Sequence, residues 1–244
     1  DEFKNIKALR DKYIEEKWDE ISGEEKFKIF REVDYDYIIS LLKNNLPSYG
    51  KDSIDAYFSL INTCFKYGEY NKAENLLDYL EDRIENYAKD KLSEFYMLNA
   101  KLNFYKNKLD ISETYYKNSL SIYEELGDIE GLIKVYNNLG IISYEFKWDT
   151  EKGKEYFKKA AELFAEANKV LSDDINVNIQ MNLGIIDDVQ GEFSNAYNKF
   201  SELINLYNNS IDKSTYFNIS LNKGYSAKNF GDYESAEKST SDLL

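Results

Sequence analysis

The chain has 244 residues, with 45 Asp and Glu against 31 Lys and Arg, and its formal net charge is −14. Sequence-independent nucleic-acid binding needs clustered Lys and Arg, so the lack of such a cluster argues against direct DNA contact by this portion. The absence of His removes the commonest acid–base residue and metal ligand. Cys64 is the single cysteine, which excludes an internal disulfide and fits a reducing cytoplasm. The sequence contains no apolar run of about 18 residues, so no membrane span is predicted.

Two amphipathic helices are predicted first, over residues 3–19 and 24–45. Their apolar residues recur near the helical period, and Ser22-Gly23 separates them. Pro47, the only proline, closes this segment. We expect residues 1–47 to form an N-terminal helical pair, either a cap or a divergent repeat.

Pairs of helices are predicted along the rest of the chain, and we name the members of each pair the A helix and the B helix. Gly68, Gly191 and Gly231 are expected to end A helices in a left-handed conformation. Acidic residues precede four A helices as expected N-caps: Asp52, Asp128, Asp173 and Asp212. The predicted A and B ranges are 52–66 and 70–88, 91–106 and 109–126, 129–146 and 150–170, 174–190 and 193–209, and 213–230 and 233–244.

Small residues recur at fixed places in these pairs. The first small position, on the A helix, is occupied by Ile61, Ala100, Gly140, Gly184 and Gly224, at spacings of 39, 40, 44 and 40 residues. The second, on the B helix, is occupied by Ala73, Ser112, Gly153, Ala196 and Ala236, with one residue inserted before Gly153. The position four residues later on the B helix falls at Leu77, Tyr116, Phe157, Phe200 and Thr240, and it holds a ring in three of the five repeats. We expect each A and B helix to cross closely at the small residues, with the ring filling the remaining space.

This pattern resembles the tetratricopeptide repeat (TPR), although its usual period is about 34 residues. The resemblance implies an all-α fold, a right-handed superhelical stack of TPR-like hairpins, or α-solenoid. Residues 51–244 would hold five repeats, the last apparently truncated. Leu244 falls inside the last B helix, so we expect either a chain trimmed there or a second subunit, as in a homodimer, covering the exposed face.

No catalytic or cofactor-binding motif is apparent. There is neither a phosphate-binding loop of the Gly-x-x-x-x-Gly-Lys type nor a Gly-x-Gly-x-x-Gly dinucleotide motif. The adjacent acids Asp173-Asp174 and Asp187-Asp188 point in different directions on a helix, so capping or solvated roles are expected for both pairs. Trp18, Trp148 and the tyrosines are expected mostly to pack the hairpins, and Cys64 to be a buried structural thiol. We therefore predict a non-enzymatic chain with no metal and no cofactor.

The resemblance implies a concave groove lined by the A helices. Asn138, Asn182 and Asn222 fall at one inward-facing position, and carboxamides there could hold a peptide backbone, since each is both donor and acceptor. Asn at this position is also common in such repeats, so both interpretations stay open. Asn178 and Asn218 lie one turn earlier on the same stripe, which favours the peptide clamp. The remaining predicted peptide-binding residues are Lys101, Lys134, Asn137, Tyr144 and Tyr225.

The repeat length and segments such as Tyr123–Asp128 and Tyr156–Ala160 look like the RRNPP receptors of Gram-positive bacteria. That resemblance implies the sensor domain of a quorum-sensing transcription regulator, which binds a short peptide pheromone in the groove. The heavy use of Lys, Asn, Ile, Tyr and Glu indicates a low-GC Firmicute, and the expected location is the cytoplasm. The DNA-binding helix-turn-helix that many such receptors carry is not visible here. Two alternatives stay open: a generic TPR scaffold for protein–protein interaction, and a response-regulator-binding protein that acts through residues 1–46.

Overall fold

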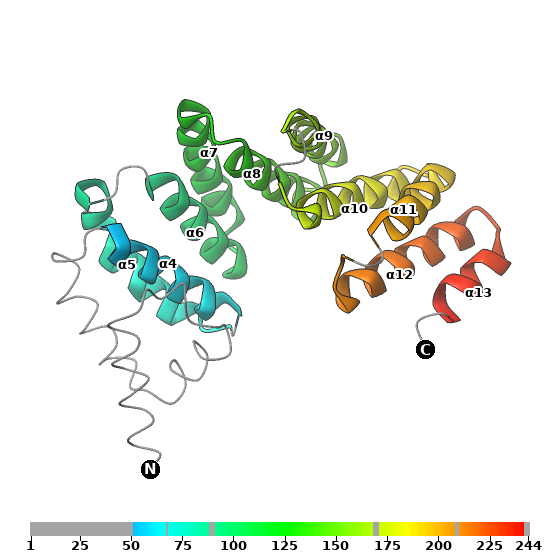
Figure 1. Ribbon diagram of the computed structural model, residues 1–244, viewed down its shortest axis with the longest axis horizontal. Helices are drawn as coiled ribbons and strands as arrows, with labels where there is room; N and C mark the ends of the chain where they lie inside the picture. The colour runs from blue at the N-terminus through cyan, green and yellow to red at the C-terminus, as the bar shows by residue number, and fades with distance from the viewer. Residues whose placement is uncertain (1–50, 67, 88–90, 168–170, 208–209, 242–244) are drawn as a thin grey trace, which may run out of the picture. The chain divides into compact units, whose positions relative to one another are not determined.

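The computed structural model describes residues 51–66, 68–87, 91–167, 171–207 and 210–241. The two helices predicted within residues 1–47 lie outside the described residues. The chain divides into two compact units, one up to Ile122 and one from Tyr123 onward, and each is described by itself. The described residues contain helices and no strand (Figure 1).

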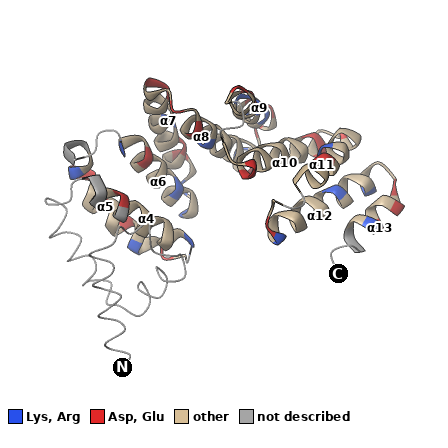
Figure 2. Ribbon diagram, viewed as in Figure 1, with Lys and Arg blue, Asp and Glu red and all other residues tan. Residues whose placement is uncertain are grey.

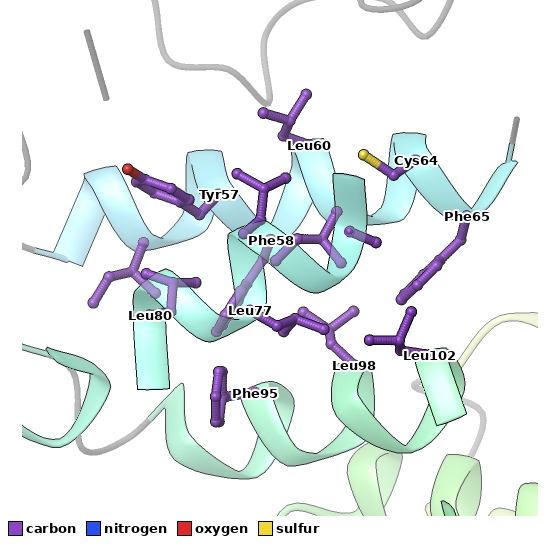
Figure 3. Packing of buried hydrophobic residues seen from close by; sticks show 14 of the residues in the cluster. Tyr57, Phe58, Leu60, Cys64, Phe65, Leu77, Leu80, Phe95, Leu98 and Leu102 are labelled. Atoms are coloured by element: carbon purple, nitrogen blue, oxygen red, sulfur yellow. The ribbon is translucent and has the colours of Figure 1, made fainter. Parts of the chain in front are cut away.

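Unit 1 contains α4 (Lys51–Lys66), α5 (Tyr70–Tyr87), α6 (Leu92–Tyr105) and most of α7 (Leu109–Leu126). Apolar side chains from α4, α5 and α6 meet in one cluster, as Figure 3 shows for Phe58, Leu77 and Leu98. Cys64 belongs to this cluster, and burial raises the pKa of its thiol to about 12. The prediction of a buried structural cysteine is therefore confirmed.

Unit 2 contains three successive pairs of helices. These are α8 (Ile129–Ile141), continued by a π-helix η3 (Ile142–Phe146), with α9 (Thr150–Glu166); α10 (Asp173–Val189) with α11 (Phe193–Tyr207); and α12 (Lys213–Asn229) with α13 (Tyr233–Ser241). Each pair packs together, and α10 also contacts α9 while α11 contacts α12. The predicted helix ranges are confirmed to within a few residues in both units.

The small positions bring helices together as the sequence predicts. A Cβ added to Gly140 would lie 2.5 Å from Phe157 Cε1, and one added to Gly184 would lie 2.7 Å from Phe200 Cε1. Both rings are almost fully buried. The ring therefore takes up the space that the missing side chain leaves, which is the predicted packing.

The second pair of helices, α6 and α7, keeps the same packing with a serine. Ser112 occupies the second small position, where its hydroxyl is fully buried. Its Oγ donates a hydrogen bond to the carbonyl oxygen of Ala100, at the first small position, over 2.8 Å. The serine thus satisfies its hydroxyl on the opposite helix instead of leaving a buried donor without a partner.

The turns after the A helices pass through a left-handed residue. Gly68, Gly191 and Gly231 have φ of 72°, 82° and 92°, which confirms the prediction for these glycines. Asn107 and Trp148 hold the equivalent places in the other two turns, with φ of 57° and 56°. Side chains other than glycine are strained in this region, and Asn tolerates it better than Trp.

The residue inserted before Gly153 is absorbed by the π-helix. After the other A helices, an amide donates to the carbonyl five residues earlier, as Glu192 does to Asp187 over 2.8 Å. In the α8–α9 turn, Asp149 donates to Ser143, six residues earlier, over 2.9 Å. Ser143 and Asp187 both lie three residues after the first small position. The extra residue therefore lies between Ser143 and Asp149. In this segment the amide of Lys147 donates a hydrogen bond to the carbonyl oxygen of Ile142, five residues earlier, which is the hydrogen bond of a π-helix.

The predicted N-caps are partly confirmed. The Asp128 carboxylate accepts a hydrogen bond from the backbone amide of Gly131, and the Asp212 carboxylate accepts hydrogen bonds from the amides of Ser214 and Thr215. Asp173 was wrongly predicted, because α10 already begins at Asp173 and its N-cap is Ser172. Asp52 was also wrongly placed, because α4 begins one residue before it.

The packing role predicted for Trp148 is wrong. Its side chain is 86% exposed. The insertion places it at the left-handed position of the turn, where the other repeats have Gly or Asn, and not on a helix face that packs. Trp18 lies outside the described residues.

Candidate functional site

The candidate site lies on the faces of α8, α10 and α12 that carry the predicted asparagines, which we call the A-helix face of unit 2. Adjacent A helices are in contact along this face. Asn182 of α10 donates from Nδ2 to Oδ1 of Asn137 on α8 over 2.9 Å. The structure therefore brings together two predicted residues that are 45 positions apart in the chain.

The side chains of Asn138 and Lys134 interact with other residues of their own helix, α8. Asn138 donates from Nδ2 to the carbonyl oxygen of Lys134, one turn earlier, over 2.8 Å. The ammonium of Lys134 forms an ion pair with Glu130 on the same helix. The carboxamide of Asn138 thus keeps its carbonyl oxygen as an acceptor, while one of its donors is already used.

A pocket of about 300 Å³ opens between α10 and α12. Two predicted residues, Asn222 and Tyr225, line it, and Tyr225 is 54% exposed. The ring of Phe200, which packs beside Gly184, forms part of its wall. Its other lining residues are Ile185, Asp188, Val189, Ser226 and Asn229. This pocket combines apolar walls with carboxamide and carboxylate groups, as small-ligand and peptide pockets do.

The two adjacent acids of α10 lie in different environments. The Asp187 carboxylate is buried and forms ion pairs with Lys154 of α9 at 3.2 Å and with Lys199 of α11 at 3.5 Å. The capping or solvated role predicted for Asp187 is therefore wrong, because the carboxylate links three helices. Asp188 instead accepts from Nδ2 of Asn229 over 3.3 Å through Oδ2, and its Oδ1 is buried with no donor from the described residues.

Tyr144 of η3 lies near the carboxylates of Glu145 and Asp188. Burial raises the pKa of its phenol, and the negative charges of Glu145 and Asp188 raise it further. Partial desolvation likewise raises the pKa of the Glu145 carboxyl, although its side chain is exposed. Tyr144 is thus associated with the end of the A-helix face at which Asp188 lies.

Two further predicted residues of unit 2 do not line the pocket between α10 and α12, and a third lies in unit 1. Lys101 belongs to unit 1, where its ammonium lies 5.6 Å from the centre of the Phe65 ring. Asn178 and Asn218 are exposed on α10 and α12 but do not line the pocket.

A second pocket, of about 270 Å³, lies in unit 1 between α4 and the start of α6. No site was predicted at this place from the sequence. Lys91 there forms ion pairs with Asp55 at 3.0 Å and with Glu94 at 3.5 Å. Burial disfavours the charged ammonium, but the two carboxylates outweigh it and raise the pKa of Lys91. Acids at matching places on successive A helices, Asp55 and Glu94, were the signal that could have found this pocket.

Charges are mixed over both units. Figure 2 shows Lys and Arg interspersed with Asp and Glu along the helices. Within the described ranges, no group of three or more His, Cys, Asp or Glu side chains is placed to hold a metal ion. No described helix is long and apolar enough to cross a membrane. The absence of catalysis stays a prediction.

Comparison with known proteins identifies the fold. No family model and no curated protein matches the sequence. The structure resembles BtubC (BKLC) from P. vanneervenii with a TM-score of 0.67 at 21% identity, over 95% of this chain and 89% of that one. It resembles the TPR-like repeats of a putative kinesin light chain from Podosopora anserina with a TM-score of 0.61 at 9% identity, over 78% and 92% of the two chains.

A third similar structure is a STAND protein with a TPR sensor, PH0952 from Pyrococcus horikoshii. Its TM-score is 0.70 at 19% identity, over 90% of this chain and 35% of that protein. The chain therefore has the TPR-like solenoid fold predicted from its repeats. At these identities the likeness establishes the fold alone.

Proposed function

We propose that the A-helix face of unit 2 binds an extended peptide, and that the chain is the sensor portion of a bacterial peptide-pheromone regulator. The observation that carries the proposal is the pocket between α10 and α12, which Asn222 and Tyr225 line. It lies on the same face as the cross-helix pair of Asn137 and Asn182. Apolar walls would take a side chain, while the carboxamides hold the backbone.

The carboxamides retain unused capacity for such a ligand. In the Asn137–Asn182 pair, one donor and one acceptor are used. Within the described structure, Nδ2 of Asn137 and Oδ1 of Asn182 have no hydrogen-bond partner. Since a peptide unit offers one donor and one acceptor, it could bond to both without breaking the pair.

The RRNPP resemblance narrows the ligand to a short exported peptide. TPR-like scaffolds also dock protein surfaces, so a protein partner is the alternative. A response-regulator partner contacting residues 1–46 would use a segment outside the described residues. A homodimer and the absence of nucleic-acid contact stay predictions.

Affinity selection of short random peptides on the full chain tests the proposal. We expect wild type to retain peptides, and Asn182→Ala and Asn222→Ala to retain about tenfold less, because each loses a hydrogen-bonding carboxamide. Asn205→Ala is the matched control, because Asn205 is exposed on α11, away from this face. All three variants should unfold within about 0.5 kcal/mol of wild type.

Equal peptide retention by wild type and both asparagine variants would overturn the carboxamide role. Retention of no peptide by wild type would overturn peptide sensing itself. Recovery of a folded protein on the same face would then support the scaffold alternative.

A further inference from the structure

We propose that the pocket between α10 and α12 accepts a primary ammonium group of the bound peptide, held by the Asp188 carboxylate. This inference rests on the proposed function and deepens it, since it states the chemistry of one ligand group. The ammonium could be a lysine side chain or the peptide's N-terminus. Both present the same group of three N–H donors with a positive charge.

The first observation is the unsatisfied oxygen of Asp188. Oδ1 is buried, and no donor from the described residues reaches it. Oδ2 receives only the neutral amide of Asn229, over 3.3 Å. Buried carboxylate oxygens in native proteins are nearly always hydrogen-bonded, so an orphan one beside a pocket calls for a donor. A charged donor gives the strongest hydrogen bond to a carboxylate.

The second observation is the contrast with the adjacent residue. Asp187 carries the same side chain one position earlier, and two lysines neutralise it at 3.2 and 3.5 Å. These lysines come from the B helices α9 and α11, and neither lysine lines the pocket between α10 and α12. The fold therefore supplies cations to Asp187, whereas Asp188 lines a pocket open to a ligand.

The third observation is the rest of the pocket lining. Asn222 and Asn229 have carboxamide oxygens that can accept further N–H donors of an ammonium. Tyr225 is half exposed at the pocket and offers a ring face, which attracts a cation. Ile185 and Val189 add apolar surface that suits the methylene stem of a lysine. Acceptor oxygens, a ring and an apolar wall together favour an ammonium over an anion.

Three pools of short random peptides, free of Lys and Arg at their random positions, test this inference. The first pool is N-acetylated with a fixed central lysine. The second is N-acetylated with norleucine in place of the lysine, and the third carries norleucine with a free N-terminus. Each pool is passed over the full chain, and the retained fraction is measured by mass spectrometry.

We expect wild type to retain the first or the third pool about tenfold more than the second, because a charge-assisted hydrogen bond is gained. Asp188→Asn keeps the shape and removes the charge, so it should abolish this preference. Asp187→Asn is the matched control, and it should lower stability while leaving the preference intact. Circular dichroism of each variant separates loss of folding from loss of binding.

The outcomes distinguish the two proposals. A preference for the first pool assigns the site to a lysine side chain, and one for the third assigns it to the N-terminus. Equal retention of all pools by wild type, or a preference unchanged in Asp188→Asn, overturns the ammonium site while peptide binding stands. Retention of no pool overturns the proposed function, and the ammonium site with it.

Discussion

The α8–α9 and α10–α11 hairpins of unit 2 use the same helix contact and different turns. Gly140 packs beside Phe157 in the first, as Gly184 packs beside Phe200 in the second. The two small positions are 13 residues apart in the first hairpin, Gly140 to Gly153, and 12 in the second, Gly184 to Ala196. The first hairpin thus keeps its packing in spite of one extra residue.

The π-helix is what separates the two turns. In α8–α9 the extra residue widens the last turn of the A helix and leaves Trp148 in the left-handed position. In α10–α11 the helix stays regular up to Val189, and Gly191 takes that position. In these two hairpins the glycine–ring contact is therefore kept while the turn between the helices changes.

The largest expected effect comes from removing the rings. Phe157→Ala and Phe200→Ala should each lower the free energy of unfolding by about 3–5 kcal/mol, because each leaves a cavity beside a glycine that cannot fill it. Urea denaturation followed by circular dichroism measures the loss. Leu206→Ala is the control, since Leu206 is 65% exposed on α11. A loss in one hairpin only would show that the two contacts are not equivalent.

A smaller effect is expected from filling the glycine. Gly140→Leu and Gly184→Leu should each cost about 1–3 kcal/mol, because even a Cβ would overlap the neighbouring ring. Hydrogen exchange should show the opening confined to the helices of the altered hairpin. If Gly140→Leu were tolerated while Gly184→Leu was not, the π-helix would be relieving the overlap.

The repeats made most of this fold predictable. The small positions recur at a nearly fixed period, and a ring often lies four residues after the second small position. This pattern predicted the helix pairs and their contact. The helix bounds followed from Asp128, Asp212 and the turn glycines. The insertion before Gly153 was visible in the spacing. The π-helix that accommodates the insertion could not be predicted. Its place depends on which backbone hydrogen bonds of the helix are replaced, and no residue type indicates this.

The candidate site was less predictable. Asn222 and Tyr225 were predicted because they occupy repeat positions expected to face a groove, and both line the pocket between α10 and α12. The different roles of Asp187 and Asp188 were missed, because they depend on lysines from other helices. Such long-range pairing leaves no local pattern in the sequence.

Exchanging the turn residues should change stability in opposite directions in the two hairpins. Gly191→Ala should cost about 1 kcal/mol, because a Cβ at φ of 82° is strained even where no atom lies near it. Trp148→Gly should relieve the same strain, with a net gain below about 1 kcal/mol, since glycine adds entropy to the unfolded chain. Thermal denaturation of both variants checks the opposite signs. A destabilised Trp148→Gly would show that the exposed indole holds a stabilising contact.

The smallest effect is expected from deleting Glu145. Its side chain is exposed, and its removal restores the 12-residue spacing, so the π-helix should close to a regular α-helix. The free energy of unfolding should change by about 0.5 kcal/mol or less. Deletion of Val189, the equivalent exposed residue of α10, is the matched control. Since α10 contains no inserted residue, this deletion shortens a regular helix, and the urea midpoint should fall clearly. If the two deletions were equally costly, the π-helix would be a required part of the α8–α9 turn, and the extra residue would no longer explain the difference between the two hairpins.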